Sequence, residues 1–188
     1  MSNLIEDFIS SLGPEVSKKL SSHTNIDEGS IQNLLPVITP MILGGLKKQK
    51  DERGGQERVD HILNKYGDPS VLNNIDDLFQ NKLNDNKTDP NLGGLLGNAG
   101  VDATNLLSNN FKVDPNIAAK IIPMLAPIVL GFLTQKRDGG TGSSGLSSLL
   151  DQDGDGSVLD DVAGLFLGGS SQSSNPLSNL LGGLLGGK

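Results

Sequence analysis

The sequence LLPVITPMILGGL occupies residues 34–46, and IIPMLAPIVLGFL occupies residues 121–133. The two runs align without a gap at a shift of 87 residues, so that identical residues coincide at five positions: Pro36 and Pro123, Pro40 and Pro127, Leu43 and Leu130, Gly44 and Gly131, Leu46 and Leu133. Each run has 13 residues, whereas a membrane-spanning helix needs about 20. We therefore expect two buried core helices that belong to two copies of one helical unit.

The same shift relates residues 63–79 to residues 150–166, with eight of 17 positions identical. We therefore predict an all-α, compact helical bundle of two tandem repeats with proline-kinked core helices. The first repeat covers residues 1–87, and the second covers residues 88–169 and shares the same core. Residues 170–188 form a tail rich in Gly, Ser and Leu, for which we expect a flexible or weakly helical conformation.

Helical spacing of apolar residues predicts the individual helices. It indicates helices over 4–12 and 15–22, which are separated at Gly13-Pro14. A further helix is capped by Asp27, and two more are expected over 56–65 and 71–82. Proline inside a helix costs about 3 kcal/mol, so Pro36 and Pro40 imply either a kinked helix or two short helices. Because proline and glycine allow another helix to approach closely, we expect the two proline helices to pack against each other about a pseudo-twofold axis. The alternative is that each proline begins a new short helix.

Composition narrows the function. The formal net charge of −7 disfavours binding to nucleic acid and to anionic membrane surfaces, because both attract basic patches. The chain has no Cys, which excludes disulfides and thiolate metal sites. With 5 Phe, 1 Tyr and no Trp, the core must be mainly aliphatic. The N-terminal residues lack the features of a secretory signal, so we expect a cytoplasmic protein, with leaderless export left open.

One stretch carries specific chemistry, an Asp-rich loop that begins at residue 151. Asp151, Asp153 and Asp155, followed by Gly156, match the first half of a calcium-binding loop, in which alternate carboxylates converge on one cation. Ser157 would offer its backbone carbonyl at the seventh position. The twelfth position, which should carry an acid, is Val162; a shifted loop would recruit Asp160 or Asp161. We therefore expect weak calcium affinity, on the order of 10⁻⁴–10⁻³ M.

A helix cap explains the same residues without a metal. Ser157 would cap a helix, and Asp160 three residues later would complete a capping box; Ser70 would cap the corresponding helix of the first repeat. That repeat has Asn64 and Tyr66 where the second has Asp151 and Asp153, so its loop does not need a metal. The cap and the metal site use different residues, and both interpretations remain open.

Enzyme chemistry has little support in the sequence. His23 and His61 are the only histidines; both are expected on the surface, with no nucleophile nearby. We therefore expect a non-enzymatic structural or interaction protein that binds an unknown protein partner or a second copy of itself. The alternative is a membrane-peripheral protein that docks through its Leu/Gly-rich tail. A metal-dependent hydrolase that uses the Asp cluster is a third hypothesis.

The proline-helix pattern, the sequence DGDGSVLDDV at residues 153–162 and the Gly/Leu-rich tail together resemble the bacterial DUF937 (YidB-like) proteins. The resemblance covers about residues 1 to 185. It implies a small all-helical bacterial protein of unknown function, and it transfers no catalytic residue.

Overall fold

The structure is a computed structural model and describes residues 4–96, 99–142 and 145–146. These residues form six α-helices and two short helical turns: α1 (Leu4–Thr24), α2 (Glu28–Arg53), α3 (Gly55–Tyr66), η1 (Pro69–Asn73), α4 (Ile75–Asn84), α5 (Ala99–Asn110), α6 (Pro115–Lys136) and η2 (Arg137–Thr141). No strand occurs in this part of the chain. The predicted all-α class is confirmed.

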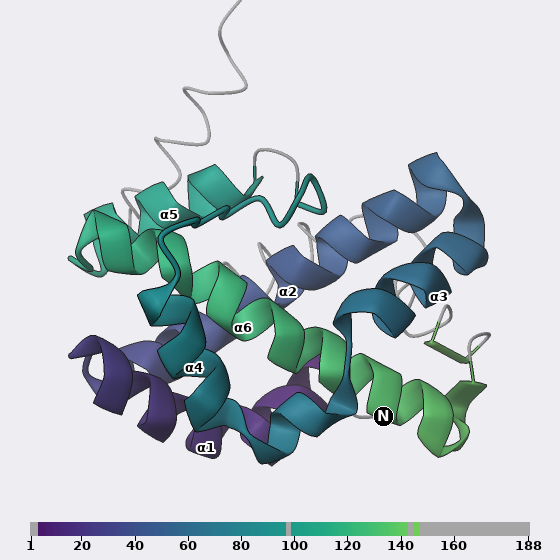
Figure 1. The fold of residues 1–188 in the computed structure, drawn as a ribbon, viewed down its shortest axis with the longest axis horizontal. Helices are drawn as coiled ribbons and strands as arrows, with labels where there is room; N and C mark the ends of the chain where they lie inside the picture. The colour runs from purple at the N-terminus through teal and green to yellow at the C-terminus, as the bar shows by residue number, and fades with distance from the viewer. Residues whose placement is uncertain (1–3, 97–98, 143–144, 147–188) are drawn as a thin grey trace, which may run out of the picture.

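Helix α6 lies at the centre of the fold. It contacts each of the other five α-helices and η1, and Figure 1 shows it running diagonally through the middle of the molecule. From Ile121 to Thr134 every residue except Pro127 is buried. A helix that is apolar on all sides is stable only when other elements surround it, which explains why the most apolar run of the sequence becomes the central helix.

The two proline helices begin in the same way, at positions 87 residues apart. Asp27 caps α2 by accepting a hydrogen bond from the Ser30 backbone N–H at 3.0 Å, as the sequence predicted. Asp114 caps α6 by accepting one from the Asn116 N–H at 2.9 Å. The counterparts of α3, η1 and α4 fall largely outside the described residues, so the tandem repeat stays a prediction.

Helix α1 differs from the prediction. Gly13-Pro14 was expected to separate two helices, but α1 continues from Leu4 to Thr24 with Pro14 inside it. Apolar residues on both sides of Pro14 are buried in the same core, including Leu4, Phe8, Val16 and Leu20. Burial of each such side chain contributes about 1.5–3 kcal/mol, so together they outweigh the cost of about 3 kcal/mol for one interior proline.

Each proline helix is a single element. Pro36 and Pro40 lie inside α2, and Pro123 and Pro127 lie inside α6, so the alternative of two short helices is wrong. The two helices contact each other, but the stripe of α6 faces elsewhere. Its Gly131 lies under η1, where an added Cβ would be 2.9 Å from the Asp68 carbonyl oxygen.

The segment after α3 also differs from the prediction. A helix was expected from Val71 and a cap at Ser70, but residues Pro69–Asn73 form the 3₁₀ turn η1, and α4 begins only at Ile75. The capping acceptor is Asp68, whose Oδ1 accepts from the Ser70 N–H at 2.8 Å. This bond stabilises the turn of η1, whose backbone lies against α6 at Gly131.

The core is aliphatic, as the composition predicted. Among the described residues, three phenylalanines join the buried cluster: Phe8, Phe79 and Phe132. The rings of Phe8 and Phe132 meet edge to face with centroids 5.4 Å apart, which ties the first turns of α1 to the last turns of α6.

Candidate functional site: a cleft with an apolar floor and a basic rim

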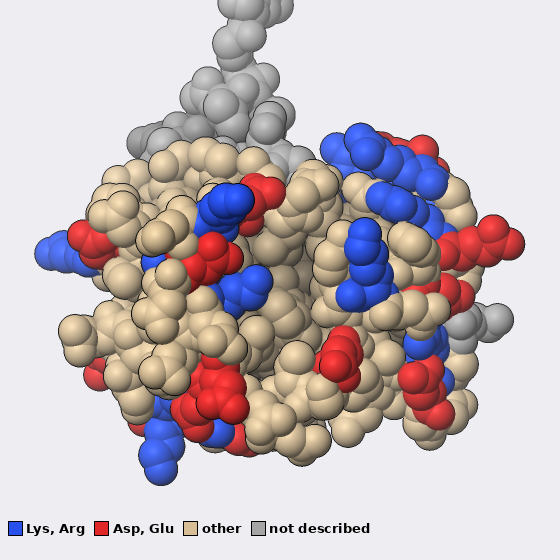
Figure 2. All heavy atoms as spheres, viewed as in Figure 1, with Lys and Arg blue, Asp and Glu red and all other residues tan. Residues whose placement is uncertain are grey.

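A cleft of about 430 Å³ lies between α3, α6 and the segment that leads from the end of α4 to Leu95. Its volume falls within the range of about 300–1,000 Å³ that is typical of ligand sites. Figure 2 shows a hollow at the centre of the molecular face, with Lys and Arg side chains on both sides of it. The cleft is therefore the candidate functional site of the described residues.

The floor of the cleft is apolar because it is one face of α6. Pro123, Ala126, Pro127 and Leu130 line it, and their spacing of three and four residues places them on one side of a helix. Across the cleft, α3 contributes Ile62 and Tyr66, and the segment after α4 contributes Leu92 and Leu95. Two prolines of the α6 stripe, Pro123 and Pro127, therefore face this cleft.

Five basic side chains line the cleft, from five different elements: Arg53, Arg58, Lys82, Lys87 and Lys120. Arg58 Nε donates to Gln49 Oε1 at 3.2 Å, and Lys120 Nζ donates to the Leu83 carbonyl. Within the described residues none of the five cations has a carboxylate partner. An excess of unpaired positive charge is therefore concentrated around the apolar floor.

The two acidic residues of the lining are bonded to the backbone. Asp85 Oδ1 accepts from the Lys87 N–H at 2.8 Å. Asp89 accepts from the N–H groups of Asn91 and Gly93 at 2.9 and 2.7 Å. Short aspartate side chains stabilise turns in this way. These carboxylates therefore shape the wall of the cleft and form no ion pair with its five cations.

Contacts with α2 fix the position of that wall. The buried Gln49 donates from Nε2 to the Gly94 carbonyl at 3.4 Å. Gly45 allows the wall to come close, because an added Cβ there would be 2.6 Å from Leu96 Cδ2 and 2.8 Å from the Leu95 carbonyl oxygen. The cleft is thus built by contacts between residues that are far apart in the sequence.

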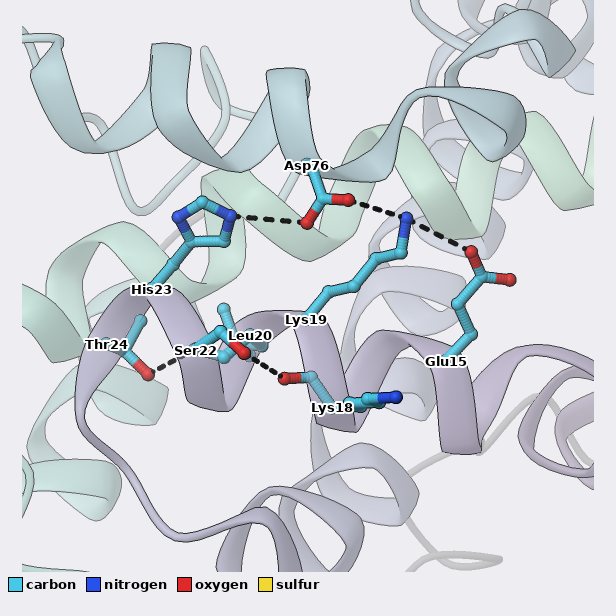
Figure 3. A network of polar contacts seen from close by, with 8 residues as sticks. All are labelled: Glu15, Lys18, Lys19, Leu20, Ser22, His23, Thr24 and Asp76. Atoms are coloured by element: carbon cyan, nitrogen blue, oxygen red, sulfur yellow. Dashed lines mark hydrogen bonds and ion pairs between the residues drawn. The ribbon is translucent and has the colours of Figure 1, made fainter.

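Helices α1 and α4 are joined by a separate charged network (Figure 3). Asp76 accepts from Lys19 Nζ at 2.8 Å and lies 3.3 Å from His23 Nε2, and Lys19 also pairs with Glu15 at 3.2 Å. The hydrogen bond from Lys19 is the main cause that lowers the pKa of Asp76. His23 was expected on the surface as a residue without a catalytic role, and here it bridges two helices.

The predicted metal site lies outside the described residues. This applies to each of its members: Asp151, Asp153, Asp155, Ser157, Asp160 and Asp161. Within residues 4–96, 99–142 and 145–146, no group of three or more His, Asp or Glu side chains is placed to hold a metal ion. The tail at 170–188, on which the membrane alternative depends, also lies outside the described part.

Two helices are long and apolar enough to cross a membrane by length and composition. They span Glu28–Arg53 and Pro115–Gly140, and 56% and 72% of their most apolar windows are buried inside the fold. The core helices of a helical bundle meet the same criterion, because α2 and α6 are covered by neighbouring helices. This feature therefore carries no argument for a membrane position.

Taken together, an all-α fold around one buried proline helix and a cleft lined by cations define a small helical protein with a preformed cleft. The model of the family described as bacterial protein of unknown function (DUF937) matches residues 6–137 and 133–188. The chain therefore belongs to the DUF937 family. Searches of the curated proteins and of the solved structures return no significant match.

Proposed function

We propose that this chain is a non-enzymatic interaction protein whose cleft binds an acidic, leucine-bearing peptide segment of a partner protein. One observation carries the proposal: five basic side chains without a carboxylate partner in the described residues surround an apolar floor. The two carboxylates of the lining accept backbone N–H groups. The cleft therefore offers mainly positive charge and apolar surface.

The sign of the local charge supports an anionic partner. The whole chain has a formal net charge of −7, yet the lining has five cations and two carboxylates, an excess of three positive charges (5 − 2). Complementary charge guides a partner to its site and excludes wrong ones. The net negative charge of the whole chain disfavours a polyanion, which favours recognition of a short acidic segment over a long nucleic acid.

The apolar floor supports a partner that also carries aliphatic side chains. Burial of one leucine contributes about 1.5–3 kcal/mol, more than the 0.2–1 kcal/mol that one exposed ion pair typically contributes. Tyr66 lies at the edge of the cleft and is 55% exposed. An exposed aromatic residue beside a pocket is a frequent anchor of protein interfaces.

The arrangement of the cations supports an extended partner. They come from α2, α3, α4, the following segment and α6, so they surround the cleft and do not form one cluster. A compact anion would reach few of them, whereas a peptide with several carboxylates can reach cations on both sides. A peptide backbone also brings N–H donors and carbonyl acceptors to the polar groups of the wall.

The test is binding of the full chain to a fluorescent peptide in which aspartate and leucine alternate, measured by anisotropy. We expect saturable binding that weakens as salt is added, and that is lost when the leucines are replaced by serine or the aspartates by asparagine. Equal binding of the asparagine peptide would overturn the charge argument. Stronger binding of oligothymidylate than of the peptide would overturn the choice of a protein partner.

Variants locate the binding site. Arg53→Ser/Lys87→Ser removes two cations of the rim, and we expect affinity to fall about two- to fivefold for each charge. The matched control is Lys18→Ser/Lys112→Asn, which removes two exposed cations that do not line the cleft. Equal losses in both double variants would show that only net charge matters, and would contradict the assignment of the cleft.

A further inference from the structure

The floor of the cleft carries a backbone feature beyond its charge and apolar surface: two prolines that lie about one helical turn apart. We infer that the carbonyl oxygens of Ala119 and Pro123 accept hydrogen bonds from alternate N–H groups of an extended peptide that lies along α6. This contact rests on the proposed function, because it assigns the part of the same cleft that holds the backbone of the acidic, leucine-bearing segment.

The two prolines free these oxygens. In an α-helix each carbonyl accepts from the N–H group four residues later, but proline has no backbone N–H. The carbonyls of Ala119 and Pro123 therefore lack their usual donors, because Pro123 and Pro127 occupy the positions four residues later. Among the described residues, no side chain and no backbone group outside α6 donates to either oxygen.

Both oxygens lie on the side of α6 that forms the floor. Residues four apart share one face of a helix, and Pro123 and Pro127 line the cleft. Each carbonyl points along the helix axis toward the residue four positions later, so the freed oxygens lie beside the rings of these two prolines. Figure 1 shows this part of α6 between α3 and the segment that follows α4, which form the walls of the cleft.

The spacing of the two acceptors matches that of an extended chain. Four residues along a helix correspond to about 6 Å. In an extended chain each residue rises by about 3.3 Å and alternate N–H groups point to the same side, so two such groups are roughly 6.6 Å apart. A helical peptide would not offer these donors, because its own carbonyls accept its N–H groups. The freed carbonyls therefore favour an extended segment over a helical one.

Lys120 complements the two acceptors. The carbonyl of each residue in an extended chain points to the same side as its N–H group, so the peptide also needs a donor at the floor. Lys120 follows Ala119 and lines the cleft. Its ammonium group has three N–H donors, and one of them is directed to the Leu83 carbonyl. The remaining donors serve a carbonyl or a carboxylate of the peptide.

Amide-to-ester substitution in the peptide tests the pairing, because an ester has nearly the shape of an amide and no N–H donor. Three versions of the alternating aspartate–leucine peptide are compared by anisotropy: all amide, esters at the leucine positions, and esters at the aspartate positions. We expect one ester peptide to bind more weakly, by about 2- to 10-fold for each lost hydrogen bond, and the other to bind nearly as well as the amide peptide. Equal affinities of the two ester peptides would overturn the inference.

Restoring a donor in the protein tests the same pairing from the other side. Pro127→Ala returns an N–H group to α6 that can bond the Pro123 carbonyl within the helix, and alanine favours a helix more than proline does. We expect this variant to stay folded, to bind the amide peptide more weakly and to show a smaller difference between the two ester peptides. An undiminished difference would contradict the assigned role of the Pro123 carbonyl.

Pro14→Ala is the matched control, because Pro14 is an exposed proline inside α1 that does not line the cleft. It should change neither the affinity nor the difference between the ester peptides. The all-amide peptide separates two kinds of failure. If it does not bind the parent chain, the proposed function and the backbone contact are both wrong. If it binds while the two ester peptides bind equally, the proposed function stands and only the role of the carbonyls is wrong.

Discussion

Gln49 of α2 and Gly94, 45 residues later, are joined by a hydrogen bond from the Gln49 side-chain amide to the Gly94 carbonyl at 3.4 Å. The same side chain accepts from Arg58 Nε at 3.2 Å. One buried glutamine therefore connects the wall of the cleft to a cation of its rim. The position of the wall depends in part on this link, because residues 85–95 form no regular helix or strand.

Replacing Gln49 by alanine should weaken both the fold and the binding of an acidic peptide. Loss of a buried hydrogen-bonding group typically costs about 1–3 kcal/mol, and we expect a loss of this size in urea unfolding together with a several-fold loss of peptide affinity. Gln32→Ala, at an exposed position of the same helix, is the control and should change neither. Full peptide affinity in Gln49→Ala would show that the wall is held by other contacts.

Tyr66 should act as an apolar anchor for the bound peptide. It is one of two large apolar side chains exposed in the described residues, at 55%, and the other is Val101, at 43%. Tyr66→Ser should lower peptide affinity by more than about fourfold, which corresponds to the loss of roughly 1 kcal/mol that marks a significant interface contact. Val101→Ser lies outside the cleft lining and should leave affinity unchanged, as measured by anisotropy.

Gly131→Ala should destabilise the chain because its Cβ would meet the Asp68 carbonyl oxygen at 2.9 Å. Overpacking of this kind typically costs about 1–3 kcal/mol. Gly139→Ala is the matched control, since a Cβ there meets nothing within 4 Å. Thermal or urea unfolding compares the two variants. Equal stability would mean that η1 does not lie against α6 as described.

The Lys19–Asp76 pair predicts a specific acid sensitivity. Lys19 lowers the pKa of Asp76, and Asp76 in turn raises the pKa of Lys19. Because the folded pKa of Asp76 lies below its unfolded value of about 3.9, the pair stabilises the fold above that pH and loses this effect as pH falls through the lowered pKa. Asp76→Asn should therefore be slightly less stable than the parent near neutral pH.

The difference between parent and Asp76→Asn should shrink in acid, where the parent carboxyl is itself protonated. Urea unfolding midpoints measured from neutral pH to below the ordinary carboxyl pKa check this. Since Asp76 is exposed, we expect a small difference at every pH. A difference that grows on acidification would contradict the assigned sign.

Calcium binding by the Asp-rich loop stays a prediction. A calcium titration followed by amide NMR should show weak binding, on the order of 10⁻⁴–10⁻³ M, with shifts confined to residues 151–162. Asp153→Ala/Asp155→Ala should abolish these shifts. No shift at millimolar calcium would leave residues 151–157 without a metal role.

The sequence predicted the helices that bury a continuous apolar run and have a clear cap. Asp27 marks the start of α2, and the run at residues 121–133 lies within the central helix. The prediction was wrong at Pro14, because helix propensity takes no account of the core contacts that Phe8 and Leu20 make on either side of it. Tertiary packing decided that element.

The cleft could not be predicted from the sequence. Its floor was visible as the proline stripe of α6, but the stripe was expected to meet α2. The wall is placed by contacts such as Gln49 with Gly94 and Gly45 with Leu96, which join loops and helices without a motif. Lys82 and Lys87, close together in the sequence, are the local signal from which part of the basic rim could have been predicted.

The most direct test of the proposed function is to map the aspartate–leucine peptide on the full chain by amide chemical shifts. The account predicts that the largest shifts occur in three segments: α3 from Ile62 to Tyr66, residues 85–95 and α6 from Lys120 to Leu130. They should fade together as salt is raised. Shifts concentrated at α1 and the Lys19–Asp76 network, with the cleft unchanged, would contradict the proposal.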